Sequence, residues 1–405
     1  MWTETRLKFL SDEPIVNGLG EAGSYDEPAW PRYVRTTDIA DSRSLRSDTF
    51  ASLPPEVALN AELRHGDLLM TAAGATIGKS YLHQGDEPAC YAGYLVRFRA
   101  RPNIDARFVA YWTESVPYWD QIRAGRVIST IENFSAGKYR SLRLSIPPYA
   151  EQRQIVAFLD AETARIDAVI EKKGAMIELL EERSFDVFSN VLIPDGSKLT
   201  RLGRFAEVQT GLTVDGSRPT GDDVVTRPYL RVANVLHGRL ALDTVTEISV
   251  PRTLAERATL RSGDILMTEG GDLDKLGRGT VWRDEIRGCL HQNHVFAVRT
   301  DPGRLDADYL ALLTQTAHGR AYFERTGSRI TNLASTSSTK VLDFPVPVLP
   351  LERQQALVRE ASAATATLVE IISRLTKQIG LLREHRQALI TAAVTGHLDL
   401  AKVAA

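Results

Sequence analysis

A glycine-rich stretch near the start of the chain has the residue spacing of a dinucleotide-binding loop. Gly18, Gly20 and Gly23 fit the pattern G-x-G-x-x-G, in which closely spaced glycines and a helix N-terminus hold a pyrophosphate. The pattern works only between a strand and a helix, whereas here the polar residues 12–14 (Asp-Glu-Pro) precede it. We therefore expect residues 18–23 to form a flexible polar loop.

A second stretch resembles a phosphate-binding loop. Residues 73–80 end in Gly78-Lys79-Ser80, but Ala73 stands where the first glycine of the motif is required, and Gly74 comes one residue late. The backbone cannot then wrap a phosphate in the usual geometry. This stretch does not predict nucleotide binding.

A third motif, Ile-Pro-Pro-Tyr at residues 146–149, resembles the catalytic Asp/Asn-Pro-Pro-Tyr/Phe of enzymes that methylate amino groups. The Asp or Asn of that motif accepts hydrogen bonds from the target amine, which an isoleucine side chain cannot do. We assign residues 146–149 to a junction between a domain and a helix.

The histidine, cysteine and acidic residues do not form a metal-binding pattern. His291 and His294 lie three residues apart, but no nearby His, Cys or H-E-x-x-H motif completes a site. Residues 272–275 loosely resemble a nuclease core, yet the preceding acid is not in a diagnostic place, and we interpret them as a loop. Cys90 and Cys289 are too few for a disulfide framework or a cysteine zinc site. We expect no catalytic residue, metal or cofactor on this chain.

The elements that would position any functional residue occur twice, because the chain contains a long internal repeat. Residues 63–71 (LRHGDLLMT) return as residues 260–268 (LRSGDILMT). Five shorter matches occur in the same order, with an offset that only drifts from 195 to 202 residues. They are Arg6-Leu7 with Arg201-Leu202, residues 33–35 with 229–231, Cys90 and Val96 with Cys289 and Val295, residues 105–108 with 306–309, and Gly125, Ile128 and Ser129 with Gly327, Ile330 and Thr331.

Each copy begins with a globular part and ends in a long helix. Residues 1–150 and 196–350 contain short apolar runs between Gly, Pro and Asp turns, which indicates a mixed α/β or strand-rich domain. The segments that follow have apolar residues at alternating three- and four-residue steps, which is a heptad seam, although Glu162, Lys173 and Arg183 interrupt the first of them. The seam residues are Ile155, Leu159, Ile166, Val169, Met176, Leu180 and Val187 in the first segment, and Val358, Ala361, Leu368, Ile372, Leu375, Ile379, Leu382 and Leu389 in the second.

Both helices have recognisable starts and ends. Pro147-Pro148 and Pro350 halt the preceding extended segments, and Glu151 and Glu352 follow where the helix dipole favours an acid. Residues 194–196 (Pro-Asp-Gly) end the first helix. Two helices that each carry one apolar stripe either bury those stripes against each other or present them to a partner subunit.

The composition is that of a folded protein without a membrane span. Of 405 residues, 43% are hydrophobic and 25% charged, and this length predicts two to three domains. No stretch reaches the ~18 apolar residues of a membrane span, and residues 1–12 lack the apolar run of a signal peptide. We expect a cytoplasmic protein with no membrane contact.

The net charge of −2 argues against a protein coated in positive charge, as many free-standing nucleic-acid binders are. A nucleic-acid binder of this composition must cluster its basic residues on one face or obtain phosphate contacts from partner subunits.

The order of these features resembles the specificity subunit of type I restriction-modification enzymes. The resemblance covers essentially the whole chain and rests on Pro147 to Gln152, on Gly66-Asp67-Leu68-Leu69-Met70 with Gly74 and Ile77-Gly78-Lys79, on Gly263-Asp264-Ile265-Leu266-Met267, and on residues 388–396 (ALITAAVTG). The second helix departs from the first, because Pro350-Leu351-Glu352-Arg353-Gln354 has its glutamine displaced.

The resemblance implies an α+β protein without catalytic activity. Two similar target-recognition domains, residues 1–150 and 196–350, would each read half of a bipartite site in double-stranded DNA. The long helices, within 151–195 and 351–405, would form an antiparallel coiled coil with pseudo-twofold symmetry. These helices would set the spacer and dock two modification subunits, which bind S-adenosylmethionine. Motor-nuclease subunits that use ATP would be added for restriction.

The implied DNA contacts are side chains that can present charge or hydrogen-bonding groups to phosphates and base edges. In the first copy they are Arg35, Lys79, Arg126, Ser129, Thr130, Asn133 and Lys138, and in the second Arg231, Lys275, Arg278, Arg329, Thr331, Asn332 and Lys340. Each could instead be an ordinary solvated side chain. The helix residues expected to bind partners are Leu159, Ile166, Leu180, Leu368, Leu375 and Leu382.

Two other functional classes compete with this interpretation. A methyltransferase or nuclease with its own recognition domain lacks the chemistry noted above. A structural adaptor that uses its duplicated domains to bind proteins, without direct DNA readout, is favoured by the absence of a basic excess.

Overall fold

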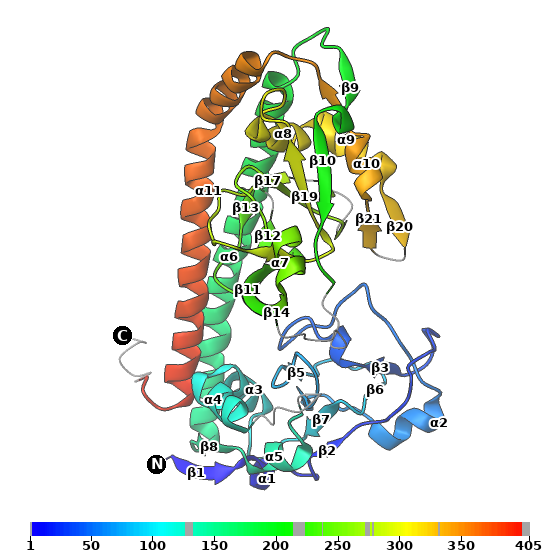
Figure 1. Cartoon of the computed structure of the whole chain (residues 1–405). Helices are drawn as coiled ribbons and strands as arrows, with labels where there is room; N and C mark the ends of the chain where they lie inside the picture. The colour runs from blue at the N-terminus through cyan, green and yellow to red at the C-terminus, as the bar shows by residue number, and fades with distance from the viewer. Residues whose placement is uncertain are drawn as a thin grey trace. The chain divides into compact units, whose positions relative to one another are not determined.

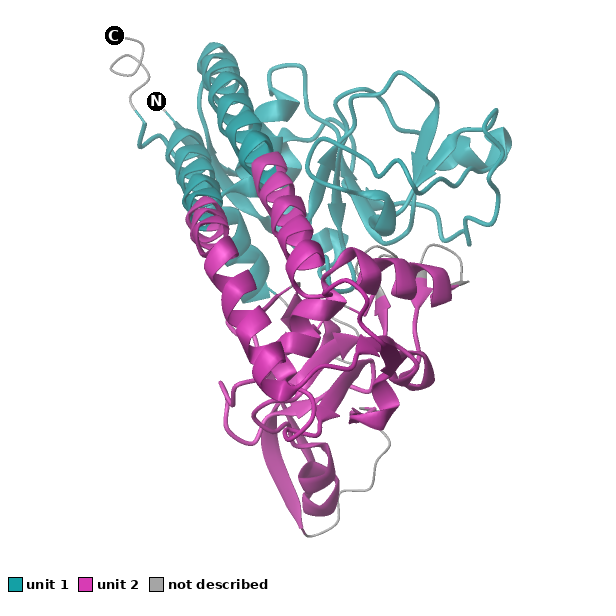
Figure 2. Ribbon diagram, turned by 90° about the horizontal axis from the view of Figure 1, so that it is seen from above, with its two compact units in different colours: residues 1–174, 377–405 teal, residues 175–376 magenta. Residues whose placement is uncertain are grey.

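Two long helices, α6 (Tyr149–Val191, 43 residues) and α11 (Leu351–Val394, 44 residues), are the longest elements of the computed structural model (Figure 1). The structure describes residues 2–125, 133–213, 223–236, 238–271, 276–277, 279–330 and 333–398. The chain divides into unit 1, Met1–Gly174 with Lys377–Ala405, and unit 2, Ala175–Thr376 (Figure 2). Each long helix therefore contributes residues to both units. The predicted mixture of sheet and helix, with one long helix in mid-chain and one near the C-terminus, is confirmed.

Unit 1 is built on an antiparallel four-stranded sheet in the order β2-β7-β4-β5. Its central strands are buried because their apolar side chains face covered surfaces on both sides. Beside it, β3 and β6 pair in parallel, and β1 pairs with β8. The strands are β1 (Thr3–Arg6), β2 (Val16–Asn17), β3 (Arg32–Val34), β4 (Leu68–Thr71), β5 (Ser80–Leu82), β6 (Ala89–Tyr91), β7 (Leu95–Phe98) and β8 (Arg143–Ile146). The short helices are α1 (Leu7–Leu10), α2 (Pro55–Ala58), α3 (Ala106–Glu114), α4 (Val116–Gly125) and α5 (Ala136–Ser141), with the 3-10 turns η1 (Thr36–Asp38) and η2 (Leu59–Ala61).

Unit 2 repeats this topology. Its four-stranded antiparallel sheet has the order β10-β19-β15-β17, β11 pairs in parallel with β18, and β9 pairs with β22. The strands are β9 (Leu199–Arg201), β10 (Ala206–Thr210), β11 (Val224–Leu230), β12 (Val235–Leu236), β13 (Arg239–Leu240), β14 (Thr246–Pro251), β15 (Ile265–Thr268), β16 (Gly270–Gly271), β17 (Gly279–Val281), β18 (Leu290–His291), β19 (Val295–Thr300), β20 (Ser328–Ile330), β21 (Leu333–Ser335) and β22 (Pro345–Pro347). The helices are α7 (Arg252–Ala258), α8 (Ala307–Thr314), α9 (Ala317–Thr326) and α10 (Ser338–Leu342), with η3 (Leu202–Arg204) and η4 (Val232–Asn234). The shared strand order supports the internal repeat predicted from the sequence.

Within each unit, parts of α6 and α11 pack in antiparallel fashion. In unit 1, Ile155 and Leu159 share a hydrophobic core with Ile390 and Val394, and further along Lys173 Nζ donates to Gln378 Oε1 at 2.6 Å. In unit 2, Phe188 and Leu192 share a core with Leu357 and Ala361. Residue numbers rise along one helix as they fall along the other. The seam is therefore buried within the chain near both ends of each helix, whereas the predicted seam residues Val169 and Met176 are exposed.

A buried glutamine fixes the start of each long helix. Gln152 donates to Pro147 O at 2.8 Å and accepts from the backbone N of Asp105 at 2.8 Å. Gln354 donates to Leu349 O at 2.9 Å and accepts from Asp306 N at 2.9 Å. Both helices begin three residues before the glutamine. The view that the second glutamine is displaced is therefore wrong, because Leu349 takes the place of the first proline.

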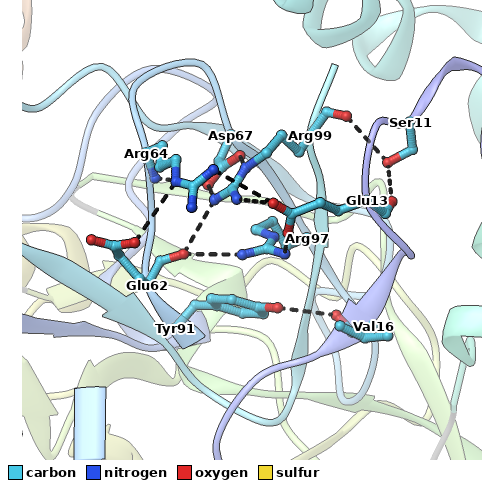
Figure 3. A network of polar contacts seen from close by, with 9 residues as sticks. All are labelled: Ser11, Glu13, Val16, Glu62, Arg64, Asp67, Tyr91, Arg97 and Arg99. Carbon is cyan, nitrogen blue, oxygen red and sulfur yellow. Dashed lines mark hydrogen bonds and ion pairs between the residues drawn. The ribbon is translucent and has the colours of Figure 1, made fainter. Parts of the chain in front are cut away.

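The repeated Gly-Asp dipeptide is a turn that carries a buried ion pair. Gly66 has φ +88° and Gly263 φ +93°, a backbone conformation that favours glycine. Asp67 accepts from Arg64 N at 2.8 Å and from Arg99 Nε and Nη2 at 2.7 Å each (Figure 3). In unit 2, Asp264 accepts from Arg261 N and from both Arg299 nitrogens, all at 2.8 Å. The dipeptide therefore belongs to the scaffold.

In unit 1 this ion pair extends to Glu13, whose carboxylate binds Arg97 and Arg99 (Figure 3). Burial alone would raise the pKa of Glu13, but the Arg99 hydrogen bond and the charges of Arg97, Arg99 and Arg64 outweigh burial and lower it. The network ties the segment before β2 to β7 and to the turn before β4.

Candidate nucleic-acid interface

Arg35 lies at the turn between β3 and η1, and its charge is already paired. Its Nε and Nη2 donate to the carboxylate of Asp38 at 3.0 and 2.9 Å, and its backbone N donates to the same group at 2.8 Å. Asp38 is completely buried. Burial raises the pKa of this carboxyl, but the hydrogen bonds from Arg35 outweigh burial and lower it. Arg35 therefore holds the turn together, and 31% of its side chain stays exposed.

Arg231 occupies the equivalent turn of unit 2 with a different partner. Its backbone N donates to Asn234 Oδ1 at 2.9 Å, so a neutral amide replaces the carboxylate of Asp38. Its guanidinium donates to Thr246 Oγ1 at 2.9 and 3.2 Å, and the residue is exposed. Because a hydroxyl does not neutralise a guanidinium, Arg231 offers more positive charge to a phosphate than Arg35 does.

Lys79 lies at the end of the loop between β4 and β5. Its ammonium donates to Ile39 O at 2.9 Å, which brings the loop beside the segment that follows Arg35. The loop joins two antiparallel strands and Gly78 turns it with φ +88°. No helix N-terminus follows it, so the structure agrees that residues 73–80 are not a phosphate loop. Lys79 also lines a cavity of about 730 Å³ with Arg43, Arg383 and Arg386.

Asn133 and Lys138 flank the same loop. Asn133 is exposed and forms a backbone bridge with Ala73. Lys138, on α5, donates to Gly125 O at 2.7 Å. The structure thus brings Lys79, Asn133 and Lys138 into one region of unit 1, around the loop after β4.

Lys340 is the counterpart of Lys138 in unit 2. It lies on α10, and its ammonium donates to Ser328 Oγ at 2.7 Å. Arg329 is placed by its backbone in β20. The other predicted contacts lie outside the described residues, and they are Arg126, Ser129, Thr130, Lys275, Arg278, Thr331 and Asn332.

The glycine-rich loop has a structural explanation. No helix follows residues 18–23, as expected for a loop. A Cβ atom on Gly18 would lie 2.1 Å from Tyr91 O, and one on Gly211 would lie 2.1 Å from His291 O. Both glycines therefore allow a close backbone contact, to β6 in one unit and to β18 in the other.

The loop also forms one wall of a cavity of about 520 Å³ in unit 1. Its lining includes Gly20, Thr36, Thr37 and Tyr94, and Tyr94 is 66% exposed. Sequence reasoning missed Tyr94. The sequence match of Cys90 and Val96 with Cys289 and Val295 would pair Tyr94 with Asn293. The strand pairing shifts this part of the repeat by one residue, because Cys90 lies opposite Tyr33 and Leu290 lies opposite Tyr229, so the counterpart of Tyr94 is His294.

In the described part of the chain, the remaining titratable groups do not form a reaction centre. Burial raises the pKa of the Cys90 and Cys289 thiols to about 12, so neither is a nucleophile at neutral pH. Burial lowers the pKa of His291, whose Nδ1 lies 2.7 Å from Val295 O. Among the described residues, no group of His, Cys, Asp or Glu is arranged to hold a metal ion. The residues 272–275 lie outside that part of the chain.

The predicted partner-binding residues divide by burial. Leu159, Ile166 and Leu375 are buried, while Leu180, Leu368 and Leu382 are half-buried. Leu159 has no exposed surface, so it packs inside unit 1. The apolar helix residues that remain exposed are Val169, Met176 and Leu179 on α6, and Val369 and Leu381 on α11. No described helix is apolar over a length that could cross a membrane.

Comparison with known proteins agrees with this architecture. The chain is 21% identical over 349 residues, 82% of this chain and 74% of the relative, to the specificity subunit of the type I restriction enzyme EcoKI from Escherichia coli (strain K12). It is 20% identical over 418 aligned residues, 98% of this chain and 85% of the relative, to the StySPI specificity subunit from Salmonella potsdam. The chain is a relative of the type I specificity subunits. No family model matches it.

A solved structure supports the fold of this specificity-subunit relative. It is described as "Structural basis underlying complex assembly and conformational transition of the type I R-M system" and matches with a TM-score of 0.55 and 17% identity over 98% of each chain. The predicted resemblance to type I specificity subunits is confirmed, and both relatives are named as subunits for specificity rather than for methylation or cleavage.

Proposed function

We propose that this chain is the DNA-recognition subunit of a type I restriction-modification complex, and that units 1 and 2 each read one half of a bipartite site in double-stranded DNA. The observation that carries the proposal is the repeated sheet topology, in which equivalent turns hold Arg35 and Arg231. Two copies of one scaffold suit two separate half-sites, and no metal-binding group of side chains occurs in the described part of the chain.

Exchange of one domain tests this proposal. Replacing residues 196–340 with the matching segment of another specificity subunit should change one half of the methylated sequence and leave the other half unaltered. The matched control exchanges residues 1–146 and should change the opposite half. The proposal fails if either exchange alters both halves, because the domains would then not read independently.

The proposed partners are two modification subunits on the helices and motor-nuclease subunits in the complete complex. Apolar side chains that α6 and α11 leave exposed, Met176, Leu179 and Leu381 among them, support a docking role because a partner that covers them would remove apolar surface from water. The purified chain alone should neither methylate DNA nor hydrolyse ATP. Turnover by homogeneous protein would contradict this assignment.

The helices would also set the spacer between half-sites. The 43 residues of α6 correspond to roughly 64 Å of helix. Four residues inserted after Glu171 would add roughly 6 Å and about 40° of rotation beyond one turn, close to the rotation of one base pair. We expect methylated sites with unchanged half-sites and a gap that is one base pair longer. An unchanged gap would show that the helix does not set the spacing.

The alternative function is a protein-binding adaptor, which the net charge of −2 favours. A gel-shift assay with a library of DNA sites, with and without the modification subunits, separates the two functions. Sequence-specific retention that requires this chain supports DNA recognition. Retention that stays the same when unit 2 is exchanged supports the adaptor.

A further inference from the structure

The two units hold one particular loop in the same way. In unit 1, Ala92 N donates to Val34 O at 3.0 Å, Gly93 N to Leu19 O at 2.6 Å, and Ala72 N to Tyr94 O at 2.7 Å. In unit 2 the equivalent bonds run from Gln292 N to Leu230 O at 2.9 Å, from Asn293 N to Leu212 O at 3.0 Å, and from Glu269 N to His294 O at 2.9 Å. The backbone of loop 92–94 is therefore reproduced in loop 292–294.

The side chains behind these loops are also shared. The Tyr33 hydroxyl donates to Leu19 O at 2.8 Å, and the Tyr229 hydroxyl donates to Leu212 O at 2.8 Å. Cys90 lies opposite Tyr33 and Leu290 lies opposite Tyr229, and both are buried. The tyrosine behind the loop is thus the same in both units, and the residue opposite it is buried and apolar in both.

The solvent-facing residues on this scaffold differ between the units. Thr36 and Thr37 of unit 1 are replaced by Val232 and Ala233 in unit 2. The loop itself changes from Ala-Gly-Tyr at 92–94 to Gln-Asn-His at 292–294. Tyr94 and His294 are both exposed, at the same place in the loop. Variation on a shared scaffold is expected where the two copies bind different chemical groups.

The groups presented at this position suit base edges better than phosphates. In unit 1 they are threonine hydroxyls and the phenol of Tyr94 around a cavity of about 520 Å³, and the one cation in its lining, Arg35, is neutralised by Asp38. Hydroxyls can contact phosphates as well as base atoms, but the carboxylate of Glu21 in the same lining would repel a phosphate. The aromatic ring of Tyr94 can in addition contact a thymine methyl.

In unit 2 the same position has a different hydrogen-bonding character. His294 Nδ1 lies 2.6 Å from Glu269 Oε2, and Asn293 Nδ2 lies 3.4 Å from His294 Nε2. In unit 1 the residue that corresponds to Glu269 is the apolar Ala72. The two surfaces therefore offer different donors and acceptors from one backbone geometry.

We infer that loops 92–94 and 292–294 are base-reading elements, and that Tyr94 and His294 determine which base pair is accepted at the equivalent position of each half-site. This inference rests on the proposed function and adds residues that read the sequence.

Single substitutions in the complex of the full chain with its modification subunits test the inference. Tyr94→Ala should reduce discrimination at one base pair of the first half-site by at least about fivefold, the value of one good base contact. The second half-site should be unaffected. His294→Ala should produce the converse result. The measurements are methylated-site mapping and competition gel shifts with DNA that varies one base pair at a time.

Two further variants serve as a matched control and as an exchange of residues between the units. Tyr25→Ala removes a tyrosine of the same unit that is 51% exposed and lies outside the cavity, and it should leave discrimination unchanged. Tyr94→His places the residue of unit 2 on the scaffold of unit 1, and it should shift the preference of the first half-site at the same base pair that Tyr94→Ala affects.

The outcomes separate the inference from the proposed function. Specific methylation by the wild-type complex, with Tyr94→Ala weakening all sites equally or changing nothing, overturns the inference alone. Absence of sequence-specific methylation by the wild-type complex overturns both. A preference change confined to one half-site supports both.

Discussion

Removal of Asp67 should destabilise unit 1 by an amount that the ion-pair network predicts. Asp67 has no exposed surface and accepts three hydrogen bonds, two of them from Arg99. Breaking a buried ion pair from one side costs about 3–5 kcal/mol, because the other charge is left without its partner. Glu13 still binds Arg99 in the Asp67→Ala variant, so we expect the lower value of about 3 kcal/mol.

The equivalent substitution in unit 2 should cost more. Among the ion pairs of the described residues, Asp264 is the sole carboxylate partner of Arg299, and Asp264 is 1% exposed. Asp264→Ala leaves Arg299 with no carboxylate in contact and only its cross-strand neighbour Glu207 at longer range, and should cost about 5 kcal/mol. The difference of about 2 kcal/mol corresponds to roughly 30-fold in an opening equilibrium.

Hydrogen exchange followed by mass spectrometry measures the local stability of each unit separately, because protection factors report local opening free energies. Asp67→Ala should speed exchange in β4 and β7 by roughly 100-fold, with β15 and β19 as the internal reference. Asp48→Ala is the control, because the Arg46–Asp48 pair is exposed and its loss should not change exchange measurably. Equal losses for Asp67→Ala and Asp264→Ala would refute the role given to Glu13.

Three other predictions concern acid stability, the helix starts and the seam. The folded pKa of Glu13 is lowered, so its contribution to the free energy of unfolding is complete above the ordinary Glu pKa and is lost as pH falls through the folded pKa. Protection of β2 and β7 against hydrogen exchange should therefore decline below about pH 4. Glu13→Gln should make that decline smaller. Gln152→Ala and Gln354→Ala should each cost about 1–3 kcal/mol in thermal or urea unfolding because buried backbone groups lose their partners, whereas the exposed neighbours Gln154→Ala and Gln355→Ala should have little effect. Leu375→Asp buries a charge in the seam and should abolish assembly with the modification subunits, whereas Leu180→Asp at a half-buried seam position should only weaken assembly. Leu381→Asp, at a residue of unit 1 that is 55% exposed, should leave unit 1 folded. A Leu375→Asp variant that unfolds at the wild-type temperature would contradict the burial of the seam.

The long helices were predictable because their signals are local and periodic. Proline before the first turn, an early acid and a three-and-four spacing of apolar residues all depend on short stretches of sequence. The burial pattern of Ile155, Leu159 and Leu375 follows from that spacing. The repeat was predictable for a similar reason, since a turn such as Gly-Asp requires particular residues at adjacent positions.

Individual surface contacts were much harder to predict from the sequence. Arg35, Lys79 and Lys138 are basic residues near repeated motifs, yet each of them forms an ion pair or a hydrogen bond with another residue of the same unit. Such partners lie up to 40 residues away in the chain, so spacing cannot reveal them. Tyr94 carries no charge and matches no motif, and its importance appears only when the backbone bonds of the two units are compared.

The pairing of basic side chains also bears on the acidic net charge. Lys and Arg together number 49 and Asp and Glu 51, and several of the basic groups near the candidate interface already neutralise a carboxylate or donate to a carbonyl. Affinity that depends on phosphate contacts grows with the number of cations that release counterions. A chain that uses its cations internally gains little of that affinity. Under the proposed function, we therefore expect its contribution to binding to come mainly from the geometry of base contacts, with partner subunits supplying the attraction to the DNA backbone.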